Sequence, residues 1–434
     1  MKRFAAFLFA AAAAFSLLSC GMPPQPQTPA LTPPPSGTAE ADVPAEAAGD
    51  AATEEKIVLD VLLACRSGET EAWFSAPGTG FVDRFESENP GVRLALQLVP
   101  PEALKQITND LLADNEAPDV VGVGDLSALV DAELLMSAEE YCPEELRRDL
   151  YPALLGEGDV RALPDLVSVR ALQLNSALLE RSGVSVPATL EELEQACRKI
   201  AAACGDEVYP LGLSMTGEDC AACFAFFAQS CGGGFVGADG SWAPGGEANA
   251  EALAFAVGLV NSGLTNPNPA RESAEELRAL FAEGRLAMLL SSWNADGGET
   301  LVPFPAADGG DGIVLGSAAR IAVFRDESAP DQAARTEAIE KFLRFFYAPD
   351  NYAERARLEG LLPASRSAAE RLAELEPACA ARTALLEYCR LLPEDKPGWD
   401  EVCEGLYSVE LLSLIGGDVR AALDDLQASL AARR

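Results

Sequence analysis

The residue types that carry most nucleophilic and acid–base chemistry are sparse in this sequence. There is no histidine among the 434 residues, which excludes Ser-His-Asp and Cys-His nucleophilic centres and the paired-histidine zinc sites of metallohydrolases. Cys220 and Cys223 have the Cys-x-x-Cys spacing of zinc and redox motifs. A zinc site needs a second ligand pair, and a redox site needs the strand of a thioredoxin-like unit before it. We therefore predict no metal and no cofactor, and expect buried thiols or local disulfides.

Carboxylates are the one abundant reactive group. Asp and Glu total 68 against 32 Lys and Arg, which gives a formal net charge of -36. Because nucleic-acid affinity comes mainly from cations that displace counterions, this charge excludes nucleic acid as a partner. Two acids are enough for glycoside hydrolysis when they lie about 5–10 Å apart, but the sequence singles out no such pair.

The first twenty residues have the layout of an export signal. Lys2 and Arg3 precede an apolar run over Phe4–Leu18 that is short for a membrane-spanning helix and typical of a secretory signal. The run ends in Leu17-Leu18-Ser19-Cys20, which resembles the lipobox of bacterial lipoproteins. The resemblance implies a signal peptide over 1–19 and lipidation of Cys20. The alternative is an ordinary signal peptide in which this cysteine is incidental.

Residues 20–55 are rich in Pro, Ala, Thr and Glu and contain almost no large apolar side chains. Such a composition cannot bury enough apolar surface to offset chain entropy, so it predicts a disordered tether. We expect the globular part to lie outside the cell membrane, held there through the lipid anchor.

From residue 57 the pattern alternates between strands and helices. Apolar runs predict buried strands at Ile57–Ala64, Val92–Val99 and 118–121, and amphipathic segments predict helices at Gly80–Glu88 and Pro101–Ala113. This order predicts an α/β fold with parallel-rich sheets flanked by helices, and ligand sites beyond the carboxyl ends of the strands.

The same region carries short motifs in a characteristic order: Phe85–Val92, Ala117–Val121, Leu163–Asn175, Val186–Leu193, Leu280–Met288 with Trp293 after it, Gly316-Ser317, Ala338–Phe346, Leu362–Ser365 and Gly416–Leu423. As an ordered set they resemble the extracellular solute-binding proteins of bacterial ABC importers, in the branch of sugar binders typified by maltose-binding protein. Leu190 stands where that family commonly has tryptophan.

The resemblance implies a two-lobed fold of the periplasmic-binding-protein type, with a hinge between the lobes. It places lobe 1 over 56–170 and 318–362, lobe 2 over 171–317 and 363–434, and the crossing segments near 168–173, 316–320 and 361–366. It further implies a non-enzymatic carrier that closes on a carbohydrate and delivers it to the transmembrane subunits of an ABC permease.

The resemblance also selects ligand residues. Family members carry a cleft aromatic shortly after the strand that contains Ala-Met, so Trp293 is predicted to stack on a sugar ring and Asn294 to bind a hydroxyl. Further candidates lie at predicted strand ends, at a helix start in the second lobe or at a crossing segment: Arg66, Ser67, Asp125, Glu218, Asp219 and Ser317. Helix capping would account equally well for Asp125, Glu218 and Asp219. A position in the core is the alternative for Trp293. Trp242 and Trp399 are weaker candidates.

Two alternatives remain at this point. Relatives often carry aromatic residues where this chain has Arg66 and Ser67, and the chain is strongly acidic. Both observations suit a binder of a cationic solute such as a polyamine or peptide. The other alternative is a surface-anchored carboxylate glycoside hydrolase.

Overall fold

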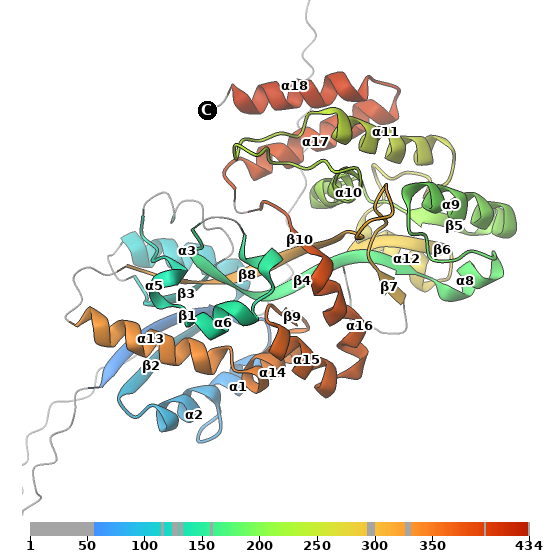
Figure 1. Ribbon diagram of the computed structural model, residues 1–434. Coiled ribbons are helices and arrows are strands. Elements are labelled where there is room, and N and C mark those ends of the chain that lie inside the picture. The colour runs from blue at the N-terminus through green and yellow to red at the C-terminus, as the bar shows by residue number, and fades with distance from the viewer. Residues whose placement is uncertain are drawn as a thin grey trace, which may run out of the picture. The chain divides into compact units, whose positions relative to one another are not determined.

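One mixed β-sheet runs through the part of the chain that the computed structural model describes, residues 56–113, 117–123, 129, 133–156, 159–292, 300–325, 331–394 and 396–432 (Figure 1). Its strands lie in the order β2 (Val92–Val99), β1 (Ile57–Ala64), β3 (Val120–Val123), β8 (Val314–Val323), β4 (Ala162–Leu174), β6 (Leu286–Ser292) and β5 (Tyr209–Gly212). Short strands add to its middle: β10 (Cys389–Leu391) on β8, and β7 (Thr300–Val302) and β9 (Leu362–Pro363) on β4.

The α/β class is confirmed, and the sheet is mixed rather than parallel throughout. Strand β1 pairs in parallel with β2 and β3, and β5 pairs in parallel with β6. Between these ends, β8 runs antiparallel to both β3 and β4, and β4 runs antiparallel to β6. The two long central strands therefore join two parallel halves.

The predicted elements of the first half form nearly as expected. Strands β1 and β2 and helix α3 (Pro101–Ala113) have the predicted bounds, α2 spans Phe81–Glu88, and β3 begins two residues later than predicted. Helix α1 (Gly68–Ser75) was not among the predicted elements. It begins after Ser67, whose hydroxyl accepts a hydrogen bond from the Thr70 amide at 3.1 Å and caps the helix.

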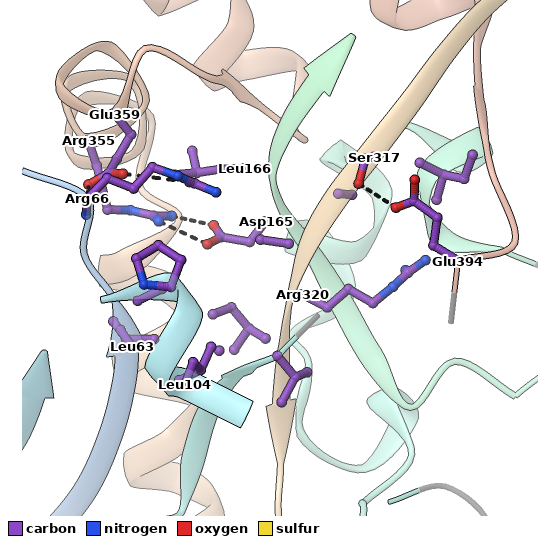
Figure 2. A pocket seen from close by; sticks show the side chains of 18 of the residues that line it. Leu63, Arg66, Leu104, Asp165, Leu166, Ser317, Arg320, Arg355, Glu359 and Glu394 are labelled. Atoms are coloured by element: carbon purple, nitrogen blue, oxygen red, sulfur yellow. Dashed lines mark hydrogen bonds and ion pairs between the residues drawn. The ribbon is translucent and has the colours of Figure 1, made fainter. Parts of the chain in front are cut away.

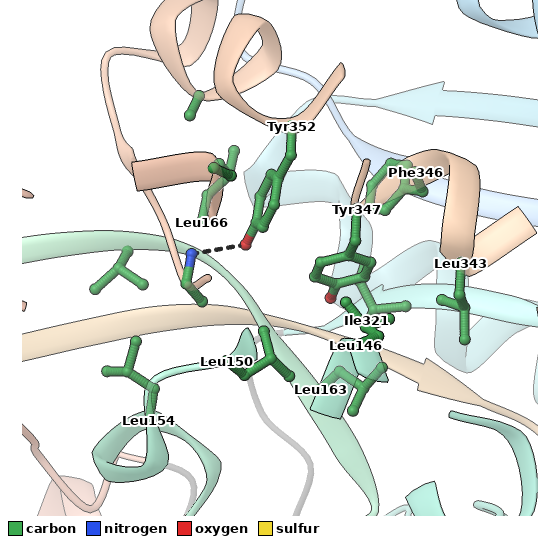
Figure 3. Packing of buried hydrophobic residues seen from close by; sticks show 14 of the residues in the cluster. Leu146, Leu150, Leu154, Leu163, Leu166, Ile321, Leu343, Phe346, Tyr347 and Tyr352 are labelled. Atoms are coloured by element: carbon green, nitrogen blue, oxygen red, sulfur yellow. Dashed lines mark hydrogen bonds between the residues drawn. The ribbon is translucent and has the colours of Figure 1, made fainter. Parts of the chain in front are cut away.

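A first hydrophobic core covers one face of the β1 half of the sheet. Alternate residues of β1, Leu59, Val61 and Leu63, face this core, whereas Leu62 faces a smaller cluster beneath α3. The first core also takes aromatic rings from α2 and from α13 (Gln332–Phe346). Figure 3 shows how its tyrosines reach the strands: the hydroxyl of Tyr352, on α14 (Pro349–Glu359), accepts a hydrogen bond from the Ala364 amide at 2.8 Å.

A second core fills the other half. Its side chains come from β4, β5, β6 and β8 and from six helices: α8 (Ser176–Arg181), α9 (Leu190–Cys204), α10 (Gly217–Ser230), α11 (Glu247–Asn261), α17 (Trp399–Leu414) and α18 (Val419–Ala431). Helix α12 (Ala274–Ala282) packs against β6 in a separate small cluster. The remaining described helices are α5 (Ala138–Tyr141), α6 (Glu144–Asp149), α7 (Pro152–Leu155), α15 (Arg366–Leu375), α16 (Ala380–Thr383), and the 3-10 turns Gly205–Glu207, Pro377–Cys379 and Ala384–Tyr388.

The chain passes between the two cores at three places. Along β4, the chain passes from the first core to the second between Ala171 and Leu172, inside the crossing predicted at 168–173. Along β8 it passes between the cores near Leu315, next to the crossing predicted at 316–320. The third change falls between Leu391 and Leu392. The chain does not change cores near 361–366, where a third crossing was predicted: β9 pairs with β4, and its Leu362 lies in the first core.

The buried residues of 364–389 also belong to the first core, together with α15. The boundary at residue 363 would have assigned them to the second lobe. We therefore propose that lobe 1 comprises 56–170 and 318–391, and that lobe 2 comprises 171–317 and 392–432.

The ten cysteines of the described residues are all free thiols. No described helix has both the length and the apolar content needed to cross a membrane. The predicted signal peptide, Cys20 and the tether lie outside the described residues.

Candidate functional site

Two adjoining cavities lie where the crossing segments meet the two cores. The larger, of about 1070 Å³, borders the second core, and the smaller, of about 400 Å³, borders the first. Ser317, Leu392 and Glu394 line both. Because they share these residues, the two cavities form one cleft along the crossing strands. We call the larger part the aromatic cavity and the smaller part the aliphatic cavity, after the side chains that distinguish them.

One face of helix α17 forms a wall of the aromatic cavity. Trp399, Cys403 and Tyr407 line the cavity at intervals of four residues, which places them above one another on the helix. Asp400 and Glu404 follow two of them and line the same cavity. Aromatic rings beside exposed carboxylates can bind the C–H faces and the hydroxyl groups of a polar solute at the same time.

The opposite face of α17 explains why this wall is held in place. Val402, Leu406 and Val409 are buried in the second core, which fixes the rotation of the helix. Gly398 precedes the helix with φ +89°, a left-handed conformation in which a side chain would also approach the Trp242 ring nitrogen. The ring of Trp399 then stacks on Trp242, with centroids 6.2 Å apart.

Polar side chains from the crossing strands and from α10 complete the aromatic cavity. Arg170 on β4 donates a hydrogen bond to Asp219 on α10 at 2.6 Å. The Ser317 hydroxyl on β8 donates to the Glu394 carboxylate, also at 2.6 Å. These contacts bring groups from both lobes to the crossing segments.

The aliphatic cavity lies beyond the carboxyl ends of β1 and β3, as a ligand site in such a sheet is expected to do (Figure 2). Two ion pairs border it. Arg355 binds Asp165 with both terminal guanidinium nitrogens, and the two side chains are only 5% and 7% exposed. Arg66 lies 3.7 Å from the Glu359 carboxylate.

Helix α17 carries one further acid that the cleft does not use. Glu410 is 1% exposed, accepts a hydrogen bond from the Cys220 thiol at 3.0 Å, and its second carboxyl oxygen has no described partner. Burial raises the pKa of Glu410 to about 8. Burial also raises the pKa of Cys220, so this thiol stays protonated at neutral pH. Among the described residues, no group of three or more potential ligands could hold a metal ion.

Comparison with known proteins identifies the family. The model of bacterial extracellular solute-binding proteins matches residues 68–353. The chain belongs to this family. Two relatives of this solute-binding protein, from Brucella abortus strain 2308 and Brucella suis biovar 1 strain 1330, are each 27% identical over 338 residues, which cover 74% of the chain and 80% of the relative. Both are described only as binding proteins.

Solved structures share the fold. The cyclic α-maltosyl-1,6-maltose binding protein of Arthrobacter globiformis matches with a TM-score of 0.70 and 20% identity, over 87% of this chain and 98% of that protein. The sugar-binding protein MalE of Xanthomonas citri gives 0.67 and 20%, over 86% and 98%. The GacH receptor of Streptomyces glaucescens gives 0.61 and 19%, over 86% and 98%. The two-lobed fold predicted from the sequence is thereby confirmed.

The family and the fold are those of non-enzymatic solute-binding proteins. This solute-binding protein is therefore not an enzyme, and the glycoside-hydrolase alternative is set aside.

The predicted ligand residues of the solute-binding protein differ in their position relative to the cleft. Arg66 and Ser317 line the cleft. Asp219 reaches its edge through the ion pair with Arg170, whereas the Ser67 hydroxyl is used as a helix cap. Trp293, Asn294 and Asp125 lie outside the described residues. The backbone of Glu218 is described, but its side chain is not.

Sequence reasoning ranked Trp399 low and missed three of its neighbours, Asp400, Glu404 and Tyr407. Trp242, the other low-ranked tryptophan, is 8% exposed and donates its ring N–H to the Pro397 carbonyl, so it supports Trp399 from behind. The spacing of aromatic residues at 399 and 407, with apolar residues on the opposite helix face, was the available signal.

Proposed function

We propose that this solute-binding protein captures a saccharide in the cleft and delivers it to the transmembrane subunits of an ABC importer. The observation that carries the proposal is the α17 wall, where Trp399 and Tyr407 alternate with the exposed carboxylates of Asp400 and Glu404. A sugar presents a flat C–H face and a rim of hydroxyls, and this wall offers a partner for each. The A. globiformis protein, which binds cyclic α-maltosyl-1,6-maltose, and the sugar-binding protein of X. citri have the same fold.

The position of the cleft supports a closing mechanism. Its walls come from both cores, which the crossing segments connect. A solute that touches both walls binds the closed form more tightly and shifts the equilibrium toward it. A permease that recognises the closed form would then distinguish the loaded carrier from the empty one.

The first test removes the aromatic ring of Trp399. Stacking on an aromatic ring is worth about 1–3 kcal/mol, and 1.4 kcal/mol is a factor of ten in affinity. Trp399→Ala should therefore weaken binding about tenfold or more, measured by calorimetry with the best ligand from a panel of maltose, longer maltooligosaccharides and other neutral oligosaccharides. Trp73→Ala is the matched control, because Trp73 is also half-buried but packs on the first core. Equal affinity in both variants, or no binding by any saccharide, would contradict the proposal.

The second candidate is a cationic solute such as a polyamine or a peptide. One observation favours it: among the described residues, neither Asp400 nor Glu404 pairs with a Lys or Arg. Adding spermidine and a lysine-rich tripeptide to the same panel separates the candidates. Binding of these cations with no binding of neutral oligosaccharides would replace the first proposal by the second.

We also propose that Cys20 anchors the mature protein to the membrane. The support is the lipobox-like sequence that ends at this residue and the proline-rich stretch that follows it. Cys20→Ala should move the protein from the membrane fraction to the soluble fraction in the native host, measured by fractionation and immunoblotting. Ser19→Ala keeps a small residue before the cysteine and serves as control. A Cys20→Ala protein that stays in the membrane fraction would disprove the anchor.

A further inference from the structure

The aliphatic cavity has a lining that a sugar alone does not require. Besides charged residues, the residues that line it and not the aromatic cavity are branched aliphatics, one phenyl ring and small apolar residues. The larger apolar ones come from β1, α1, α3, β3, β4 and β8: Leu63, Phe74, Leu104, Val123, Leu166 and Ile321. Figure 2 labels Leu63, Leu104 and Leu166 among them. Branched aliphatic side chains offer neither the flat face on which a sugar stacks nor a hydrogen bond for its hydroxyls. This end of the cleft therefore favours a hydrocarbon group of a ligand over its hydroxyl groups.

Six charged residues also line the cavity, and each of them interacts with another residue of the protein: Arg66, Asp165, Arg320, Arg355, Glu359 and Glu394. Arg355 is paired with Asp165, and Arg66 with Glu359. The Glu359 side chain is only 4% exposed, so its charge faces the arginine rather than the cavity. The methylene stem of an arginine adds further apolar surface when its head group is paired elsewhere. The surface that remains available to a ligand in this cavity is mainly apolar.

The size and the position of the cavity define the occupant. A cavity of roughly 150 Å³ is enough to hold benzene, and this one measures about 400 Å³. It continues into the aromatic cavity along Ser317, Leu392 and Glu394. From this continuity we propose that the ligand is amphipathic: a saccharide whose sugar part lies against α17 and whose alkyl, acyl or aryl substituent occupies the aliphatic cavity.

This inference rests on the proposed saccharide function, but it makes a separate prediction. Each methylene group moved from water into an apolar site favours binding. A longer alkyl substituent on one and the same sugar should therefore raise the affinity. If the cleft contacted only the sugar, the affinity would not depend on the length of the alkyl chain.

The first test needs no sugar. Titration of the wild-type protein with the neutral apolar fluorophore N-phenyl-1-naphthylamine should raise its emission on saturable binding. Ala319→Phe fills the cavity from β8, where Ala319 is exposed and can be enlarged without disturbing a core. It should reduce the affinity for the fluorophore at least tenfold. Ala95→Phe, at an exposed alanine of β2 outside the cavity, should leave it unchanged. Absence of saturable binding, or equal binding by all three proteins, would overturn the proposal.

The second test uses calorimetry with methyl β-maltoside and hexyl β-maltoside. We expect the hexyl compound to bind the wild-type and Ala95→Phe proteins at least tenfold more tightly than the methyl compound, and the two compounds to bind Ala319→Phe alike. If both bind the wild type equally, the amphipathic ligand is refuted while the saccharide proposal stands. If neither these maltosides nor the oligosaccharide panel binds, the saccharide proposal fails, and the fluorophore titration then decides whether the aliphatic cavity binds apolar groups at all.

Discussion

Arg355→Ala should destabilise the protein by about 3–5 kcal/mol, since that is the cost of leaving one partner of a buried ion pair without its counter-charge. Asp165 lies in an irregular segment of β4 and is buried against the first core, where both terminal nitrogens of Arg355 bind its carboxylate. Arg355 also lies over the ring of Phe346, 4.1 Å from its centroid, so truncation removes packing as well as charge. Urea unfolding followed by far-UV circular dichroism would measure the loss.

The same helix supplies a matched control. Arg357 pairs with Glu354, but these side chains are 39% and 34% exposed. Arg357→Ala should therefore change the free energy of unfolding by less than about 1 kcal/mol. The double variant Asp165→Leu/Arg355→Met should recover part of the loss, because no uncompensated charge remains. Similar losses for Arg355→Ala and Arg357→Ala would show that the buried pair has no special role.

Glu410→Gln should stabilise the protein at alkaline pH and remove part of its pH dependence. Burial raises the pKa of Glu410 from 4.5 to about 8, so between these values the folded protein holds a proton that the unfolded chain releases. The contribution of this group to stability is thus complete below about pH 4.5, declines as the pH rises, and is lost above about pH 8. Since one pKa unit corresponds to about 1.4 kcal/mol, the difference from wild type at pH 8.5 is on the order of several kcal/mol.

Urea unfolding of wild type and Glu410→Gln at pH 5 and pH 8.5 tests this sign. The advantage of the glutamine variant should be small or absent at pH 5 and large at pH 8.5. Glu404→Gln is the control, because Glu404 lies on the same helix but is exposed in the cleft. Because exposed substitutions usually change the free energy of unfolding by less than about 0.5 kcal/mol, Glu404→Gln should stay close to wild type in both buffers. A constant difference for Glu410→Gln as well would mean that this carboxyl has an ordinary pKa in the folded protein.

The local spacing of apolar residues was sufficient to predict the helices and strands in which buried residues recur regularly along the chain. The apolar run of β1 and the apolar faces of α2 and α3 can be recognised from neighbours in sequence, and these elements formed at or near the predicted residues. Helix α1 was missed because a single side chain, Ser67, caps its start, and the helix has no strong apolar pattern of its own. The ordered motifs identified the family because each reflects a local requirement of the fold.

The candidate site was only partly accessible to the same reasoning. Arg66 and Ser317 line the cleft, and they could be chosen because strand ends and crossing segments can be located from pattern; that they bind a ligand stays a prediction. The ion pair between Arg355 and Asp165 joins residues 190 apart in sequence, and no local signal couples them.

The sequence by itself determined the class of the fold, the family, the acidic charge and the absence of imidazole chemistry, since each depends on composition or on short-range order. The tertiary structure decided which surfaces meet. The apolar residues Val402, Leu406 and Val409 predict that α17 has a buried face, but not what its other face adjoins. Trp399 and Tyr407 become cleft residues only because the chain leaves the first core at Leu391 and packs α17 onto the second. This packing depends on contacts between residues far apart in the sequence, which a local sequence pattern does not contain.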